Sequence, residues 1–235
     1  MIVAERKKLD QILAMLAPYR KVLILACGSC VTVCLTGGEK QADELASQLR
    51  LAAKEKGLDL AVDVDCITRQ CDKEFFDNLK AKPGAYDAVL SIACGVGVGF
   101  MAEQFPGSII LPGLDTTFYG ANTAPGVWAE YCHGCGECVL DQTGGICPIA
   151  RCSKSLINGT CGGTSHGKCE VSKDMDCGWY LIYKRLKEIG KLDQYRAMRP
   201  AKDWRKDRGS GVRRLTHAEM EEERSEGPKV QSSKS

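Results

Sequence analysis

The first half of the chain alternates short apolar runs with stretches in which apolar residues recur at helical spacing. Val22–Ala26 is continuously apolar, which is typical of a strand buried on both faces of a parallel sheet. Residues 39–56 carry alanine and leucine every three or four positions, which predicts a helix that ends at Gly57. The remaining predicted elements are strands at Leu58–Val64, Ala88–Ala93 and Ser108–Leu111 and a short helix at Asp72–Leu79.

This alternation predicts an α/β fold with a doubly wound parallel sheet. We assign residues 1–111 to this domain, of Rossmann or flavodoxin-like type. Its first eighteen residues place apolar side chains at helical spacing, with charges between them, namely Ile2, Leu9, Ile12, Leu13 and Leu16.

The pattern changes at Pro112. Glycine, proline, threonine and cysteine dominate up to Cys177, with little periodicity of either kind. Such a segment buries little apolar surface, so we expect a loop-rich, metal-stapled domain over residues 112–208. It closes with a C-terminal helix at Gly178–Gly190, and the charged residues 209–235 are predicted to be a disordered tail.

Composition and charge restrict the classes of function. The 235 residues carry a formal charge of +2, which provides no strong field for a nucleic acid or a membrane surface. Charges interrupt the N-terminal apolar residues, so no secretory signal is predicted, and the apolar run Val22–Cys27 is too short to span a bilayer. We therefore expect a cytoplasmic protein with no membrane span and no nucleic-acid partner.

The fourteen cysteines are the most informative feature of the composition. Structural disulfides are rare in a reducing compartment, where dense cysteine more often serves metal or redox chemistry. Disulfides and inert buried thiols are the alternatives, and buried thiols account for one or two cysteines rather than fourteen. No Ser/His/Asp set, phosphate-binding loop or separated carboxylate pair competes as a catalytic constellation.

Six cysteines form a first group in the α/β half, each after a predicted strand. Loops after successive parallel strands meet at one edge of the sheet, so we expect a metal or redox site there. A helix starting near Gly37 directs its positive end at the same edge, which favours thiolates. The preferred ligands are Cys27, Cys30, Cys66 and Cys94, with Cys34 and Cys71 as alternates.

A glycine-rich stretch, Cys94–Gly99, follows the third strand. A dinucleotide-binding turn is one interpretation, but the strand is not the first and the full fingerprint is missing. We favour a turn whose glycines let backbone N–H groups approach the sulfurs of a cluster.

The second group is the most specific motif. Cys132, Cys135 and Cys138 have C-x2-C-x2-C spacing, and Cys147 precedes a proline after a longer gap. Ferredoxins hold [4Fe–4S] clusters with a similar run, although their fourth cysteine follows sooner. Structural zinc also uses C-x2-C pairs, but a third closely spaced cysteine favours a cluster. We predict that these four cysteines bind an iron–sulfur cofactor.

The third group has nearly even spacing and fits either a second cluster or an all-thiolate zinc site. Its members are Cys152, Cys161, Cys169 and Cys177. His133 and His166 lie inside the cysteine loops, where they are either donors to metal ligands or plainly exposed residues.

Three stretches resemble the small subunit of acetogen-type methylenetetrahydrofolate reductases, the MetV type. They are CGSCVTVCLTGGEK from Cys27, EYCHGCGECVLDQTGGICPIARCSKSLINGTCGG from Glu130 with the later GKCEV and DCGW, and IYKRLKEIGKLDQYRAMRPAKDW. The resemblance covers roughly residues 5–208. It is to a family that carries the methylene-tetrahydrofolate reductase C-terminal, zinc/iron–sulfur-binding domain.

The resemblance implies an accessory subunit that does not itself bind folate. Such a subunit holds two or more [4Fe–4S] clusters, with zinc as a further candidate, and transfers electrons in the one-carbon metabolism of acetogenesis. The implied partners are a flavin-containing TIM-barrel subunit, which reduces methylenetetrahydrofolate to methyltetrahydrofolate, and a further electron-donating complex.

Two other hypotheses stay open. In the first hypothesis, the chain is a non-redox, zinc-stapled scaffold that docks and stabilises the flavoprotein. In the second, the sheet-edge site is itself catalytic and activates a small substrate at an open metal position.

Overall fold

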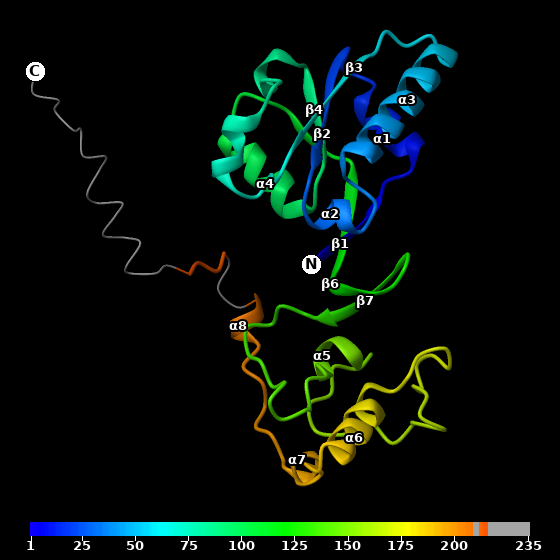
Figure 1. Ribbon diagram of the computed structural model, residues 1–235, viewed down its shortest axis with the longest axis vertical. Helices are drawn as coiled ribbons and strands as arrows, with labels where there is room; N and C mark the ends of the chain where they lie inside the picture. The colour runs from blue at the N-terminus through cyan, green and yellow to red at the C-terminus, as the bar shows by residue number, and fades with distance from the viewer. Residues whose placement is uncertain (209–211, 216–235) are drawn as a thin grey trace, which may run out of the picture.

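Four parallel strands form the sheet that organises the first half of the chain (Figure 1). The structure is a computed structural model and describes residues 1–208 and 212–215. The strand order is β3-β2-β4-β5, with β2 at Lys21–Cys27, β3 at Ala61–Ile67, β4 at Ala88–Ile92 and β5 at Ile110–Pro112. The predicted α/β class with a parallel sheet is therefore confirmed.

Burial of both faces holds β2 in the middle of this sheet. Its even-numbered apolar residues share a core with α1 (Leu9–Leu16) and α3 (Glu39–Glu55). Leu23 and Leu25 point to the opposite face and pack toward α4 (Gly95–Gln104). A continuously apolar run is thus explained by helices on both sides of the strand.

The second parallel strand begins three residues later than predicted, at Ala61 rather than Leu58. The apolar pattern breaks at Asp65, yet that buried carboxylate accepts hydrogen bonds from the backbone amides of Lys80 and Ala81, at 2.8 and 3.0 Å. Because these bonds compensate the buried charge, the strand continues through it.

Most other elements of the first half lie close to their predicted places. The helix α3 and the strand β4 are confirmed, and the short helix at Asp72–Leu79 is a 3-10 helix, η1 (Lys73–Asn78). A one-turn helix and a second 3-10 turn complete this part, α2 (Cys30–Val33) and η2 (Pro83–Ala85).

An antiparallel sheet of order β1-β6-β7 was missed by the sequence pattern. Its strands are β1 (Ile2–Arg6), β6 (Leu114–Ala124) and β7 (Val127–Cys132). Ile2 therefore lies in a strand rather than on the helical face that continues into α1. The pairing has register irregularities at Val3/Ala4, Tyr119/Gly120 and Asn122/Ala124, which interrupt the period-two alternation that identifies strands.

A small second core surrounds Trp179, which is fully buried in α6 (Gly178–Glu188), the helix predicted at Gly178–Gly190. Trp179 Nε1 donates a hydrogen bond to the Leu156 carbonyl at 2.8 Å. Three one-turn helices accompany α6 in this part of the molecule (Figure 1), namely α5 (Pro148–Arg151), α7 (Asp193–Arg196) and α8 (Arg205–Arg208).

Arg199 ties the loops of this second core together. Its guanidinium lies 5.5 Å from the Trp179 ring centre and donates to the carbonyls of Gln142, Ile157 and Gln194 at 2.9–3.3 Å. Asn158 exchanges two further hydrogen bonds with the Arg199 backbone. A buried cation thus stabilises segments that have few apolar residues of their own.

Two predictions are not decided by this arrangement. The domain boundary at residue 111 stays a prediction, and β6, which lies beyond it, pairs with β1. The tail predicted at 209–235 lies outside the described residues, apart from 212–215. Among the helices that the structure describes, none is long and apolar enough to cross a membrane.

Replacing Arg199 with leucine is expected to lower the free energy of unfolding by about 3 kcal/mol, because three carbonyls lose the charged donor that a buried arginine provides. Chemical denaturation followed by tryptophan fluorescence measures this change. Arg196→Leu is the matched control, since Arg196 is exposed three residues earlier. Equal stability of the two variants would contradict the role given to Arg199.

Asp87 makes stability depend on pH. The backbone amides of Lys21 and Arg20 donate to its carboxylate at 2.8 and 2.9 Å and hold its pKa below the ordinary value of 3.8. A depressed folded pKa stabilises the fold above the unfolded pKa, and this contribution is lost as the pH falls through the folded pKa. The difference in melting temperature between wild type and Asp87→Asn should therefore be largest near neutral pH and shrink in acid. A difference that does not vary with pH would contradict this.

Candidate functional site

The carboxyl ends of β2, β3 and β4 place cysteines at one edge of the parallel sheet. Cys27 is the last residue of β2 and Cys94 is the cap residue that precedes α4. In the sheet register Ala26 is paired with both Cys66 and Ile92, so the three strands end at nearly the same level. The loops after these strands therefore face the same region.

Cys27 lies within electrostatic range of the four other thiols at this edge, Cys30, Cys66, Cys71 and Cys94. Burial raises the pKa of Cys27, and the charges of Cys94 and Cys30 raise it further. Burial likewise raises the pKa of Cys71, with contributions from Cys27 and Cys94, and Cys66 interacts with Cys27. Burial is the main cause of the raised pKa at Cys27, Cys66 and Cys71. A metal ion binds the deprotonated form of such thiols.

Cys34 belongs to another environment. Its sulfur lies 3.1 Å from Thr36 Oγ1, 3.6 Å from the Val31 carbonyl and 3.9 Å from the carbonyl of Ala4 in β1, and the side chain is buried. Of the two alternates to the preferred ligands, the exposed Cys71 lies within electrostatic range of Cys27 and Cys94, whereas Cys34 packs against β1.

The glycine-rich stretch after β4 is the first turn of α4 rather than the predicted turn. A Cβ atom at Gly97 would lie 2.8 Å from that of Ala93 and 3.0 Å from that of Gln70, so close packing explains this glycine. The helix begins directly after Cys94, so the positive end of its dipole lies at this edge of the sheet.

Gln70 was not identified from the sequence, yet it fixes the loop that carries Cys71. The fully buried amide donates to the carbonyls of Leu25 and Ala26 at 2.8 and 3.1 Å and accepts from the Ser91 hydroxyl at 2.6 Å. It thereby joins this loop to β2 and β4. No spacing rule reveals such a residue, because its partners lie more than twenty positions away.

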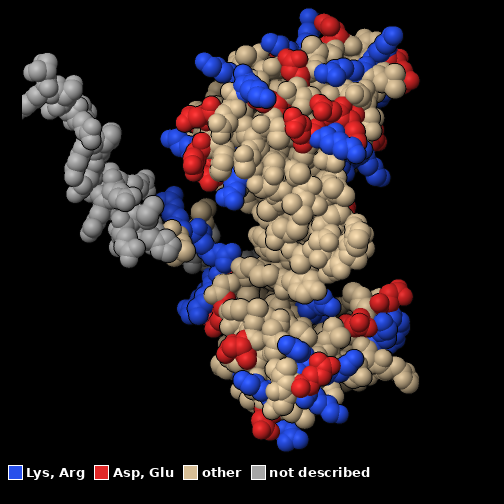
Figure 2. Space-filling model, in the orientation of Figure 1, with Lys and Arg blue, Asp and Glu red and all other residues tan. Residues whose placement is uncertain are grey.

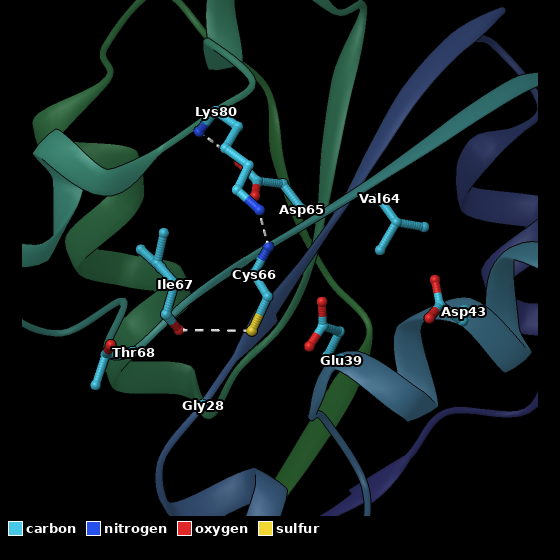
Figure 3. Close-up of a pocket in the computed structure, with 9 residues that line it drawn as sticks. All are labelled: Gly28, Glu39, Asp43, Val64, Asp65, Cys66, Ile67, Thr68 and Lys80. Carbon is cyan, nitrogen blue, oxygen red and sulfur yellow. Dashed lines mark hydrogen bonds between the residues drawn. The ribbon is translucent and has the colours of Figure 1, made fainter.

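A cavity of about 400 Å³ opens beside this edge and contains Cys66 (Figure 3). Glu39 and Asp43 of α3 and Lys80 line the same cavity. Burial raises the pKa of the Cys66 thiol, and the nearby Glu39 carboxylate raises it further. The wall of this cavity therefore combines a thiol with groups of both charges.

The four cysteines of the second group line a single cavity of about 180 Å³. Cys132 ends β7, and Cys147 is the cap residue before α5, where Pro148 takes the first helical position. Between them, Cys135 is buried, and its sulfur lies 3.6 Å from the Glu137 carbonyl. The longer gap before Cys147 thus does not prevent that residue from reaching the cavity.

Two glycines shape the loop of the second group. Gly134 and Gly136 have φ angles of 70° and 77°, in the region that other residues rarely adopt. The Gly134 amide donates to the Cys132 sulfur at 3.3 Å. The left-handed Gly134 thus turns its backbone N–H toward a sulfur.

The third group is only partly assembled. Cys152 and Cys177 belong to the core around Trp179, and Thr164 donates to the Cys177 sulfur at 3.0 Å. Cys169 lies 3.7 Å from the Ser153 hydroxyl; the Val171 amide and that hydroxyl lower its pKa. Cys161 is exposed.

All fourteen cysteines lie within the described residues and all are free thiols in the structure. Across residues 1–208 and 212–215, no three His, Cys, Asp or Glu side chains are grouped as ligands of a single metal ion. The assignment of individual ligands to centres therefore stays a prediction.

His133 lines the second cavity with its Nε2 3.7 Å from Asp207, whereas His166 lies in a turn at a φ of 50°.

Gln70→Leu is expected to reduce the free energy of unfolding by about 2 kcal/mol, because buried carbonyls and the Ser91 hydroxyl lose their partner. The freed loop should also make Cys71 react faster with iodoacetamide, as mapped by mass spectrometry. Gln48→Leu, on the exposed side of α3, is the control. If both variants behave alike, Gln70 does not hold this loop.

Residues 111–205 match the protein family described as methylene-tetrahydrofolate reductase C terminal. The match includes the second and third cysteine groups and leaves the sheet-edge cysteines outside. The comparison with curated proteins and the comparison with solved structures each found no match. The segment 111–205 is therefore similar to the C-terminal domain of methylene-tetrahydrofolate reductases.

Proposed function

We propose that this chain is the iron–sulfur electron-transfer subunit of a methylenetetrahydrofolate reductase complex. The observation that carries the proposal is the cavity lined by Cys132, Cys135, Cys138 and Cys147. This cavity lies inside the segment that matches the reductase C-terminal family.

The residues around this cavity fit a [4Fe–4S] cluster in their chemistry. Four thiols supply one ligand for each iron, and Gly134 provides a backbone donor to sulfur. Tyr131 and the buried Ile149 are among the other residues that line the cavity. A bound cluster supplies one-electron transfer, and the chain supplies its ligands, its hydrogen bonds and its shielding.

The sheet edge is proposed as a second metal centre. Cys27, Cys30, Cys66 and Cys94 remain the preferred ligands, and the electrostatic interaction of Cys71 with Cys27 and Cys94 supports it as the alternate. The third group, at Cys152, Cys161, Cys169 and Cys177, is proposed to hold zinc or a further cluster.

The proposed partner is the flavin-containing subunit that reduces methylenetetrahydrofolate to methyltetrahydrofolate. The resemblance to the MetV type and the matched family both connect the chain to this reaction. In this arrangement the flavoprotein binds the folate and the clusters exchange electrons with the flavin, in the cytoplasm.

Metal analysis of anaerobically purified protein tests the proposal. Iron and acid-labile sulfide are expected in at least the amount of one [4Fe–4S] cluster per chain, together with an EPR signal after reduction by dithionite. Zinc without sulfide, in a sample that stays EPR-silent, would overturn electron transfer and leave the zinc-stapled scaffold.

A pair of cysteine variants locates the centre. Cys135→Ser is expected to remove the iron and sulfide of one cluster, because a buried ligand in the middle of the run is lost. Cys34→Ser should leave the metal content unchanged, since this thiol packs against β1. Equal losses of metal in the two variants would contradict the assignment.

A further inference from the structure

We infer that residues 199–208 form a cationic strap, pinned by Lys202 and Glu137, that closes over the cysteine loop 132–138 and places positive charge beside its cysteines. The strap itself is defined by contacts within this chain. Only its effect on a bound cluster rests on the proposed function.

The strap begins at a fixed point. Arg199 is anchored by the carbonyls around Trp179 and by the paired hydrogen bonds with Asn158. From there to Arg208 the segment carries five basic and two acidic residues. Figure 2 shows Lys and Arg side chains gathered around the position that α8 has in Figure 1, at the edge of the molecule.

Glu137 pins the strap from within the cysteine loop. Its carboxylate accepts from the Asp203 amide at 3.2 Å and pairs with Lys202 at 3.5 Å and Lys206 at 3.4 Å. Only 6% of the Lys202 side chain is exposed, so this pair is shielded from water on the lysine side. The only acidic residue between Cys132 and Cys138 therefore faces the strap.

One carbonyl connects Lys202 with a candidate ligand. The Glu137 carbonyl accepts from Lys202 Nζ at 3.3 Å and from the Cys135 thiol at 3.6 Å. Cys138 and Lys202 also line a common pocket of about 170 Å³ between the loop and the strap. Lys202 thus shares a hydrogen-bond acceptor with the Cys135 thiol and a pocket with Cys138.

Further contacts hold the strap close to the loop. Arg213 bridges the two by donating to the carbonyls of Gly134 and Lys206, at 3.1 and 3.0 Å. A Cβ atom at Gly136 would lie 3.0 Å from the Lys206 carbonyl, so the absence of a side chain permits this approach. Asp207 faces His133 at 3.7 Å.

A nearly buried cation at this place interacts with any charge that the cysteine loop holds. A charge in a poorly hydrated position interacts more strongly than one on the surface. The net charge and solvent exposure around a cluster set its reduction potential. Lys202 is therefore a positioning residue that also favours the more negative, reduced form of a cluster held by the loop.

Hydrogen exchange of the full chain, as purified, tests the strap whatever metal is bound. In Lys202→Gln and in Glu137→Gln the Asp203 amide is expected to exchange about tenfold faster than in wild type, since one charge-assisted contact no longer holds it. Lys202→Arg should restore protection. Arg205→Gln is the matched control, because this exposed residue of the strap pairs only with its neighbour Asp203 among the contacts described.

Exchange in Lys202→Gln and Glu137→Gln that equals exchange in Arg205→Gln would overturn the strap. Two variants are used so that one misfolded protein does not decide the test. A variant whose tryptophan fluorescence shows that the core around Trp179 is lost is set aside, and exchange in the other variant then decides.

Redox titration followed by EPR tests the charge. Lys202→Gln should shift the reduction equilibrium about tenfold toward the oxidised form, which is about 59 mV for one electron, and Arg205→Gln should shift it little. A cluster signal whose potential is unchanged in Lys202→Gln would overturn the charge effect. A sample without any reducible centre would instead overturn the proposed function, and hydrogen exchange would then decide the strap alone.

Discussion

Burial of β2 between helices on both faces is the constraint on which the rest of the first half depends. Because both faces are covered, the strand can be continuously apolar, and its neighbours β3 and β4 are held parallel to it in a fixed register. The loops that follow parallel strands all leave the sheet at the same edge, so this register also decides where the cysteines after each strand lie. The fold core and the sheet-edge thiols are thus consequences of the same packing, and Gln70 adds the hydrogen bonds that bring the loop of Cys71 to that edge.

The second lobe has no comparable layer of apolar residues. Its buried core contains little more than Trp179, Ile182, Leu186 and the Cys177 side chain. Polar contacts provide part of its stability. Arg199 donates hydrogen bonds to three carbonyls, and Asn158 donates to the Arg199 carbonyl. Cysteines occupy the ends of its short elements, where the backbone is fixed but amides remain free to face a ligand. A lobe built in this way gains stability from any metal bound by those thiols, which is the reason to expect metal centres to act as staples here.

The sequence identifies elements whose pattern is local and misses those whose cause is distant. The runs of β2 and β4 and the stripe of α3 are visible because burial repeats at the period of the element. The apolar pattern does not predict the strands β1, β6 and β7, because register irregularities break the alternation and because Ile2 also fits a helical face. Among candidate site residues, the cysteine groups follow from spacing and topology, whereas the partners of Glu137 lie more than sixty residues away along the chain. Hydrogen bonds across such separations leave no periodic trace.

The hairpin of β6 and β7 connects the two cysteine-bearing regions. Near its start the Thr116 hydroxyl accepts from the Gly95 amide, next to Cys94, at 2.8 Å. At its end Cys132 is paired with Tyr119, three residues along β6 from Thr116. Three residues of strand span roughly 10 Å, so the sheet-edge thiols and the cysteine loop are linked through a short, hydrogen-bonded segment. The hairpin fixes the loop at Cys132, and residues 199–208 hold it at Glu137. Support from both sides restricts the loop before any cofactor binds, and restricted ligands lose less conformational freedom when they bind one.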